Sequence, residues 1–326
     1  ENDYVIVDAN TYTLKMFDQS DLTTPYKVVG SPRNQDGMFA QSAGLSFDKK
    51  KKELYITDIS NHRVQVFNSK NGKFKRTIGQ LGFGTVAGDL IAPLGVSVID
   101  DKVYVASSTH QIVVFDKQGT EINRIGAYGF GAGEFYYPYD VKQDSKGNFY
   151  VTEHYNNRMQ KFDSEWNYIS TIGGYGTDDG AMYLPTRIYI DKQDRIFVAD
   201  TFNNRIQVFD SETGAFIAKF GSYGQAEGSL YLPYALTMDK KEKYIILGES
   251  GNNRISVFKN DENFTFVKTY SKLGATEEDS FFPSALDQCG SRFEFCMTNR
   301  MQNNAKRFKL KIKKFDKKKG KDKSDD

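Results

Sequence analysis

The chain has 326 residues, of which 44 are Lys or Arg and 42 are Asp or Glu, so its formal net charge is only +2. No run of 18 or more apolar residues occurs, and no segment is therefore expected to insert into a membrane. Aromatic residues make up 14% of the chain and are nearly all Tyr or Phe, a composition that suits packed β-strands.

Taken in order, the chain begins with three apolar stretches of strand type at residues 4–7, 14–17 and 26–29, with no innermost strand before them. Five units of four predicted strands each follow, and a further innermost strand is predicted at 284–288. The five units begin near Ala43, Pro93, Pro138, Pro185 and Pro233.

The best copy of the repeated segment is 196–209, which reads IFVADTFNNRIQVF. Apolar residues alternate on both sides of the turn-forming Thr201–Asn204 stretch, which predicts a β-hairpin. Asp200 closes the first strand and Arg205 opens the second, so a charge-assisted pair is expected to brace the turn. The other complete copies lie at 54–67, 149–162 and 244–258, with the pairs Asp58/Arg63, Glu153/Arg158 and Glu249/Arg254. Because these pairs recur in every good copy, they are expected to build the repeat and to form no functional site.

Each copy is preceded by a predicted strand near a proline and followed by one that often ends in glycine, which gives four strands in about 48 residues. Such repeats are typical of a β-propeller. The PLGV sequence at 93–96 and the NHRVQVF sequence at 61–67 resemble the NHL repeats. This resemblance implies an all-β, NHL-type β-propeller of four-stranded antiparallel blades. Proteins of this type include RNA-binding tripartite-motif relatives, an amidating lyase and interaction scaffolds.

Innermost strands favour six blades, with seven as the alternative because 292–297 and 306–312 also read as strands. In the six-bladed arrangement the N- and C-terminal segments share the closing blade, and the residues after about 291 pack as an extra element. The predicted domains are a propeller at 1–304 and a basic C-terminal tail at 305–326. The tail has eleven Lys or Arg against four Asp. Its candidate residues for binding a polyanion are Lys306, Arg307, Lys309, Lys311, Lys313 and Lys314.

Two faces follow from the topology. The turns between second and third strands and the connectors between blades lie on one face, whose acidic rim speaks against bound RNA. That rim comprises Asp36, Asp89, Glu134, Asp178, Asp179, Glu227, Glu277, Glu278 and Asp279. The opposite face collects Lys49–Lys52, Lys70, Lys73, Lys75, Lys146, Lys240, Lys241 and Lys243.

Aromatic residues near the axis of the acidic-rimmed face are the candidate protein-binding site, because Tyr and Arg often anchor interfaces. They are expected to surround one exposed guanidinium, with inter-blade packing as the alternative role. The residues are Tyr139, Tyr155, Arg187, Phe202 and Tyr234.

An enzyme of the amidating-lyase type would need histidines gathered around a metal. The chain has three, His62, His110 and His154, all in turns between second and third strands, and their placement cannot close a tetrahedral zinc site. No hydrolase nucleophile motif occurs either. A catalytic residue, a metal and a cofactor are therefore not expected.

Cys289 and Cys296 do not face each other in the predicted register. Two free thiols are expected, with a disulfide as the alternative, which favours an intracellular (cytoplasmic) compartment. The triplet Asn263-Phe264-Thr265 is a glycosylation sequon and weighs the other way. Together these features predict a non-catalytic protein-interaction platform, a scaffold or a subunit of a larger assembly, with no small-molecule substrate. RNA binding through the lysine-rich face and the tail is one alternative, and a metal-dependent propeller lyase or hydrolase is the other.

Overall fold

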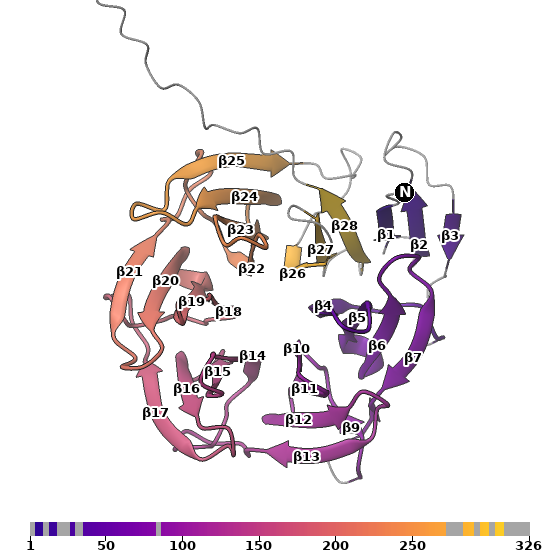
Figure 1. Cartoon of the computed structure of the whole chain (residues 1–326). Helices are drawn as coiled ribbons and strands as arrows, with labels where there is room; N and C mark the ends of the chain where they lie inside the picture. Colours follow the sequence, from indigo (N-terminus) through magenta and orange to yellow (C-terminus); the bar gives the residue numbers. More distant parts are fainter. Residues whose placement is uncertain are drawn as a thin grey trace, which may run out of the picture.

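The computed structural model describes residues 35–82, 86–271, 283–289 and 294–299, together with strands at 4–8, 13–17, 27–29 and 304–309. These residues form antiparallel sheets arranged around a central axis (Figure 1). Within them the helical elements are two short 3-10 turns, η1 (Ile59–Asn61) and η2 (Thr201–Asn203). No helix in this described part is long and apolar enough to cross a bilayer.

Five sheets are four-stranded blades in which each strand pairs with the next along the chain. The first is β4 (Ser42–Asp48), β5 (Glu53–Asp58), β6 (Arg63–Asn68) and β7 (Phe74–Ile78). The second is β10 (Gly95–Ile99), β11 (Lys102–Ser107), β12 (Gln111–Asp116) and β13 (Glu121–Ile125). The third is β14 (Pro138–Gln143), β15 (Phe149–Glu153), β16 (Arg158–Phe162) and β17 (Tyr168–Gly173). The fourth is β18 (Ile188–Ile190), β19 (Arg195–Asp200), β20 (Arg205–Asp210) and β21 (Phe216–Phe220). The fifth is β22 (Pro233–Met238), β23 (Tyr244–Glu249), β24 (Arg254–Lys259) and β25 (Phe266–Ser271).

The two ends of the chain form one six-stranded sheet, so the expected count of six four-stranded blades, and the alternative of seven, are wrong. Its order is β26 (Pro283–Gln288), β27 (Glu294–Asn299), β28 (Asn304–Lys309), β1 (Tyr4–Asp8), β2 (Thr13–Phe17) and β3 (Lys27–Val29). The residues after 291 are not an extra element: β27 and β28 lie between β26 and β1. The ends of the chain meet where Ile6 pairs with Lys306.

The core lies between neighbouring blades, because strands that are buried on both faces send alternate side chains to two neighbours. In β19, Ile196 and Val198 pack toward the β14–β17 blade, whereas Phe197 and Ala199 pack toward the β22–β25 blade. All four side chains are fully buried. The predicted alternation is thus confirmed, and each blade is held by its two neighbours.

The acid and arginine at the mouth of each repeat hairpin form the predicted ion pair. The Nε–carboxylate distance is 2.7 Å for Arg205 and Asp200, and the pairs of Arg63, Arg158 and Arg254 are alike, at 2.6–3.1 Å. Arg205 also donates from its terminal nitrogens to the carbonyl oxygens of Thr177, Asp178 and Ala181, each at 2.8 Å. These carbonyls belong to the connector that enters the blade, so the pair fastens both the hairpin and the connector.

Glycines end the fourth strands because the backbone there turns with positive φ beside a buried side chain. Gly126 has φ +83°, and a Cβ at this position would lie 2.3 Å from the ring of Phe135. Gly79, Gly173 and Gly221 have the same conformation and meet Leu90, Met182 and Leu230 in the same way. In the first connector the equivalent contact is a short parallel pair, β8 (Gln80–Leu81) with β9 (Asp89–Leu90).

Cys289 and Cys296 form a disulfide, so the prediction of two free thiols is wrong. Cys296 pairs with Asp287 across the β26–β27 hairpin, and Cys289 follows Asp287 by two residues. The two cysteines are therefore diagonal neighbours on one face of the sheet, and their Cα atoms are 5.8 Å apart. That separation lies within the normal disulfide range. The bond is buried against the β4–β7 blade, next to Phe39 and Leu45.

Candidate functional site

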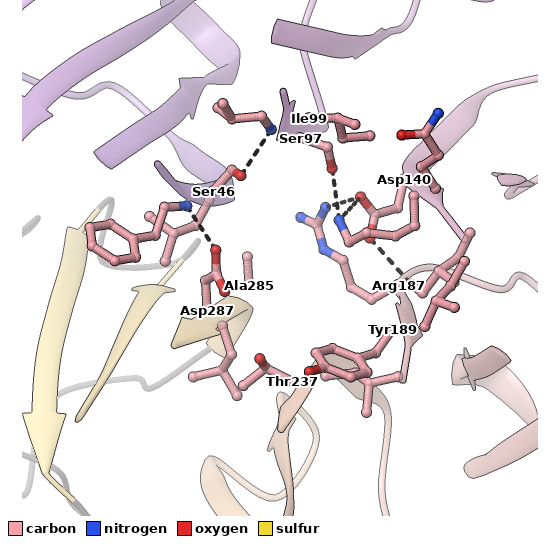
Figure 2. Close-up of a pocket in the computed structure, with 18 of the residues that line it drawn as sticks. Ser46, Ser97, Ile99, Asp140, Arg187, Tyr189, Thr237, Ala285 and Asp287 are labelled. Atoms are coloured by element: carbon pink, nitrogen blue, oxygen red, sulfur yellow. Dashed lines mark hydrogen bonds and ion pairs between the residues drawn. The ribbon is translucent and has the colours of Figure 1, made fainter. Parts of the chain in front are cut away.

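A cavity of about 230 Å³ lies on the axis of the ring. It is enclosed by the first strand of each four-stranded blade and by β26, and Figure 2 shows the side chains around it. Each of these strands contributes a polar side chain to the lining of the cavity. In five of the six strands this residue lies four positions after the proline at or near the start of the strand, which we call the blade proline. These side chains are Ser46, Ser97, Lys142, Tyr189, Thr237 and Asp287.

Arg187 is buried beside this cavity and is not the exposed guanidinium that the sequence predicted; its exposed fraction is 5%. The guanidinium donates to the carbonyl oxygens of Ser284 (3.3 Å), Ala43 (3.1 Å) and Leu94 (3.4 Å), which lie in β26, in β4 and directly before β10. It also lies 3.7 Å from the carboxylate of Asp140. Arg187 thus ties the centre of the ring together, because its fixed fork of donors satisfies carbonyls that converge on the axis.

The buried Asp140 and the partly exposed Lys142 form a second ion pair in the cavity, at 3.0 Å. The ammonium also donates to Ser97 Oγ (2.7 Å) and to the carbonyl oxygen of Val141 (3.3 Å), so its three protons are all used. The carboxylate accepts the backbone N–H of Ile188 at 3.2 Å. The donors of the Lys142 ammonium are therefore saturated by the protein itself.

Asp287 is a second carboxylate in the lining of the cavity, and each of its oxygens can accept a further hydrogen bond. Its carboxylate accepts the backbone N–H of Phe47 and of Gln288, each at 2.7 Å. Burial raises the pKa of this carboxyl above its ordinary value, although these bonds and the charges of Lys142 and Lys49 oppose the rise. A carboxyl group with a raised pKa can act as a proton donor or acceptor.

Reasoning from sequence missed Asp140, Lys142 and Asp287. A signal was present: all three are charged residues inside strands whose other residues are largely apolar, two or four residues after a blade proline. Aligning the first strands of the blades on their prolines would have gathered the ring of polar side chains.

Of the predicted protein-binding residues, Tyr139 and Tyr234 are buried, at 2% and 9% exposure, whereas Tyr155 and Phe202 are exposed. The prediction of one exposed aromatic surface is therefore wrong for Tyr139 and Tyr234. These two side chains belong to a buried cluster near the axis, next to Arg187. The Arg187 guanidinium carbon lies 5.1 Å from the centre of the Tyr139 ring. His154 links the buried and exposed rings, with centroids 5.4 Å from Tyr139 and 5.2 Å from Tyr155.

Exposed rings follow the connectors in a repeated arrangement. Edge-to-face pairs join Tyr128 to Tyr136 (5.3 Å), Tyr175 to Tyr183 (5.3 Å) and Tyr223 to Tyr231 (5.1 Å). The first two pairs continue onto the neighbouring turn, where Tyr136 meets Tyr155 at 5.0 Å and Tyr183 meets Phe202 at 5.5 Å. We call the exposed members the aromatic face: Tyr128, Phe130, Tyr155, Tyr175, Tyr183, Phe202 and Tyr223.

Acidic side chains accompany the aromatic face, as the sequence predicted for this rim. Glu134, Asp178, Asp179, Glu227 and Asp36 are exposed. Asp89 departs from the prediction, because it is buried and its carboxylate accepts the backbone N–H of Val86 at 2.9 Å. Glu277, Glu278 and Asp279 lie outside the described residues.

The predicted lysines of the opposite face are all exposed. Some are paired with acids, as Lys146 is with Glu212 at 3.0 Å and Lys75 is with Glu53. The expected tail begins inside a strand, because β28 carries Lys306, Arg307 and Lys309. Lys311, Lys313 and Lys314 lie outside the described residues, so the polyanion site and the domain boundary at 304/305 stay predictions.

Each histidine is used in joining one blade to the next. The Nδ1 atoms of His62 and His110 accept the backbone N–H groups of Ala92 (3.0 Å) and Tyr137 (3.1 Å), and Nδ1 of His154 lies 3.2 Å from the carbonyl oxygen of Pro185. Among the described residues, no three His, Cys, Asp or Glu side chains gather where they could hold a metal ion. The residues present therefore do not fit the histidine-bound metal of an amidating lyase.

Comparison with known proteins gives the family. The family model for the SMP-30/gluconolactonase/LRE-like region matches residues 41–270. The protein brain tumor of Drosophila melanogaster is 30% identical over 122 residues, which are 36% of this chain and only 11% of that protein. The resemblance to NHL repeats is thereby confirmed at the level of the fold family, since the matched family of β-propellers is related to them.

Solved structures share the architecture. Virginiamycin B lyase from Staphylococcus aureus has a TM-score of 0.63 at 15% identity, covering 94% of this chain and 91% of that chain. The WD40 propeller domain of Doa1 has a TM-score of 0.62 at 13% identity, covering 95% and 90%. At these identities the likeness shows the fold alone. The expectation that the protein is no enzyme is not supported, because the matched family is named after a lactonase. With most of its length matched by the family model, this chain belongs to the SMP-30/gluconolactonase/LRE-like family of β-propellers.

Proposed function

We propose that this protein is a protein-interaction platform, a scaffold or a subunit of a larger assembly, and that its partner binds the aromatic face. The observation that carries the proposal is the exposure of repeated rings on neighbouring connectors: Tyr175 and Tyr223 are 75% and 69% exposed. Contiguous exposed aromatic surface marks interaction sites, and Tyr is a frequent anchor of interfaces. The acidic residues beside the rings favour a partner segment that carries Lys or Arg.

The proposal is tested by affinity capture from native extract with three forms of the protein. The first is the unchanged protein, and the second carries Tyr175→Ala and Tyr223→Ala. The third is a matched control with Ile122→Ala and Ile217→Ala, which removes exposed apolar side chains from the outer strands β13 and β21. We expect one set of proteins to be retained by the first and third forms and lost by the second. Retention of the same set by all three would refute the proposal.

RNA binding through the lysine-rich face predicts a different result of the same capture. The retained material would then be sensitive to ribonuclease, and its affinity would fall steeply with salt. A shortened chain for this test should end after Lys309, because removing residues from 306 onward would delete most of β28 from the closing sheet.

Catalysis in the axial cavity is the second candidate, favoured by the raised pKa of Asp287. Asp287 would act there as a general acid or base toward a small molecule. Lactone hydrolysis by the unchanged protein and its loss in Asp287→Asn, with an unaltered melting temperature, would support this candidate. Absence of turnover in the unchanged protein across a panel of lactones would argue against it.

A further inference from the structure

The hairpin turn between β24 and β25 presents the one glycosylation sequon of the chain, Asn263-Phe264-Thr265. Asn263 and Thr265 are exposed, whereas Phe264 is buried. The ring of Phe264 stacks on Phe220 of the neighbouring blade at 4.6 Å and meets Phe197 edge-on at 6.2 Å. The turn is thus anchored by its central residue, and the acceptor amide lies at the surface.

The hydrogen bonds described for this turn do not involve the side-chain amide of Asn263, whereas both the backbone N–H and the side chain of Thr265 bond to the carboxylate of Asp261. The backbone N–H of Thr265 donates to Asp261 Oδ1 at 2.9 Å, and its carbonyl oxygen accepts the N–H of Lys259 at 2.8 Å. Both bonds involve main-chain atoms of Thr265. A substituent on Asn263 therefore disturbs no hydrogen bond described for this turn.

The disulfide supplies an independent argument. Both cysteines of the chain are consumed in the Cys289–Cys296 bond. Disulfides persist in oxidising compartments, which are also where sequons receive their sugars. The sequon and the disulfide lie in different sheets and point to the same compartment, which replaces the intracellular location expected for free thiols.

We propose that Asn263 carries an N-linked glycan, added while the chain passes through an oxidising secretory compartment. The co-substrate is an oligosaccharide linked to a lipid by pyrophosphate. A bond forms between Nδ2 of Asn263 and the anomeric carbon of the first sugar, and the bond from that carbon to the pyrophosphate oxygen breaks. The lipid pyrophosphate leaves and the amide nitrogen loses one proton, so nothing is oxidised or reduced.

The position of the glycan agrees with the proposed function without depending on it. Turns between third and fourth strands lie on the face opposite the connectors. A glycan at Asn263 would therefore cover part of the lysine-rich face, beside Lys240, Lys241 and Lys243 in the same blade. The aromatic face would stay free for a partner.

The test uses the protein isolated from its native source, digested with trypsin without reduction. The peptide at 260–268 is expected to appear only after treatment with an amide-cleaving glycosidase in heavy-oxygen water, with Asn263 converted to a labelled Asp. Full recovery of that peptide with unmodified Asn263 before treatment would overturn the proposal. Alkylation of Cys289 and Cys296 without a reductant would overturn the argument from the disulfide.

Two matched variants, expressed from the complete gene in cells of the source organism, separate the sequon from the fold. Thr265→Ser keeps the sequon, and we expect the glycosidase-sensitive shift in electrophoretic mobility to persist. Thr265→Ala and Asn263→Gln destroy it, and the shift should vanish. An unchanged shift in Thr265→Ala and Asn263→Gln, or none in the unchanged protein, would refute the assignment.

Discussion

Replacing Arg205 by Gln should cost more stability than replacing Arg205 and Asp200 together. The side chain of Asp200 is fully buried, and its carboxylate keeps hydrogen bonds from Asn203 and Gln207 when the arginine is gone. What it loses is the positive charge at 2.7 Å. An uncompensated charge in the interior is the dominant cost of breaking a buried pair.

The expected loss for Arg205→Gln is about 3–5 kcal/mol in the free energy of unfolding. The double variant Asp200→Ser, Arg205→Gln removes both charges and copies an arrangement that the chain already contains. In the β10–β13 blade Ser107 pairs with Gln111 at the hairpin mouth, and Gln111 Nε2 donates to the carbonyl oxygen of Gly126 at 3.2 Å. The remaining cost is that of lost hydrogen bonds, about 1–2 kcal/mol.

The measurement is urea unfolding at pH 7, with the slope of the transition checked for constancy among variants. A second measurement at lower pH tests in which direction the stability loss of Arg205→Gln changes with pH. Burial raises the pKa of Asp200, so on acidification the folded state takes up its proton before the unfolded state does. The loss in Arg205→Gln should therefore shrink as the pH falls, and the loss in the double variant should not. A double variant less stable than Arg205→Gln at pH 7 would refute the reasoning.

Three further outcomes are expected. Arg187→Met should lower the free energy of unfolding by about 1–3 kcal/mol, because it removes charged donors from carbonyl oxygens of three other parts of the ring while Asp140 keeps Lys142, and Arg187→Lys should not restore the loss; full stability of either variant would contradict the role of Arg187 in joining the blades. Burial lowers the pKa of His110, so the stability that its Nδ1 bond contributes is present above pH 6.5 and lost below it. In His110→Asn this acid loss should disappear while stability at pH 8 is kept, since Asn157 makes the same bond to Leu184 at 2.9 Å; an unchanged pH profile would count against the bond. Cys289→Ser with Cys296→Ser should lower the free energy of unfolding by about 2–4 kcal/mol, measured by urea unfolding without reductant; identical curves would argue that the bond is not formed.

Local features of the fold were predictable because they depend on neighbours in sequence. Alternation placed Ile196 and Phe197 on opposite faces of one strand, and a spacing of five residues joined Asp200 to Arg205. The blade count was not predictable in this way. It depends on how many strands the sheet shared by the two ends contains, and the six strands joined by the pairing of β28 with β1 exceed the four of a regular blade.

The residues of the candidate site can be grouped in the same way, into those placed by neighbours in sequence and those placed by distant segments. Tyr155 and Phe202 sit on turns, so their exposure follows from the hairpin alone. Arg187 follows a blade proline just as Asp140 does, but its burial is decided by carbonyl oxygens from three other parts of the ring. The prediction of two free thiols was wrong for a geometric reason. The predicted register compared residues directly opposite each other, whereas the two cysteines are diagonal neighbours.

The strand β28, which pairs with β1, is synthesised after all five four-stranded blades. When a ribosome has made the five repeats, β1 still lacks its neighbour, because β28 begins only at Asn304. Loop closure over such a separation is slow, and unpaired strand edges are prone to aggregate in the meantime. Ring closure in this protein therefore waits for β28, and the edge of β1 that β28 covers stays unpaired until that strand is made.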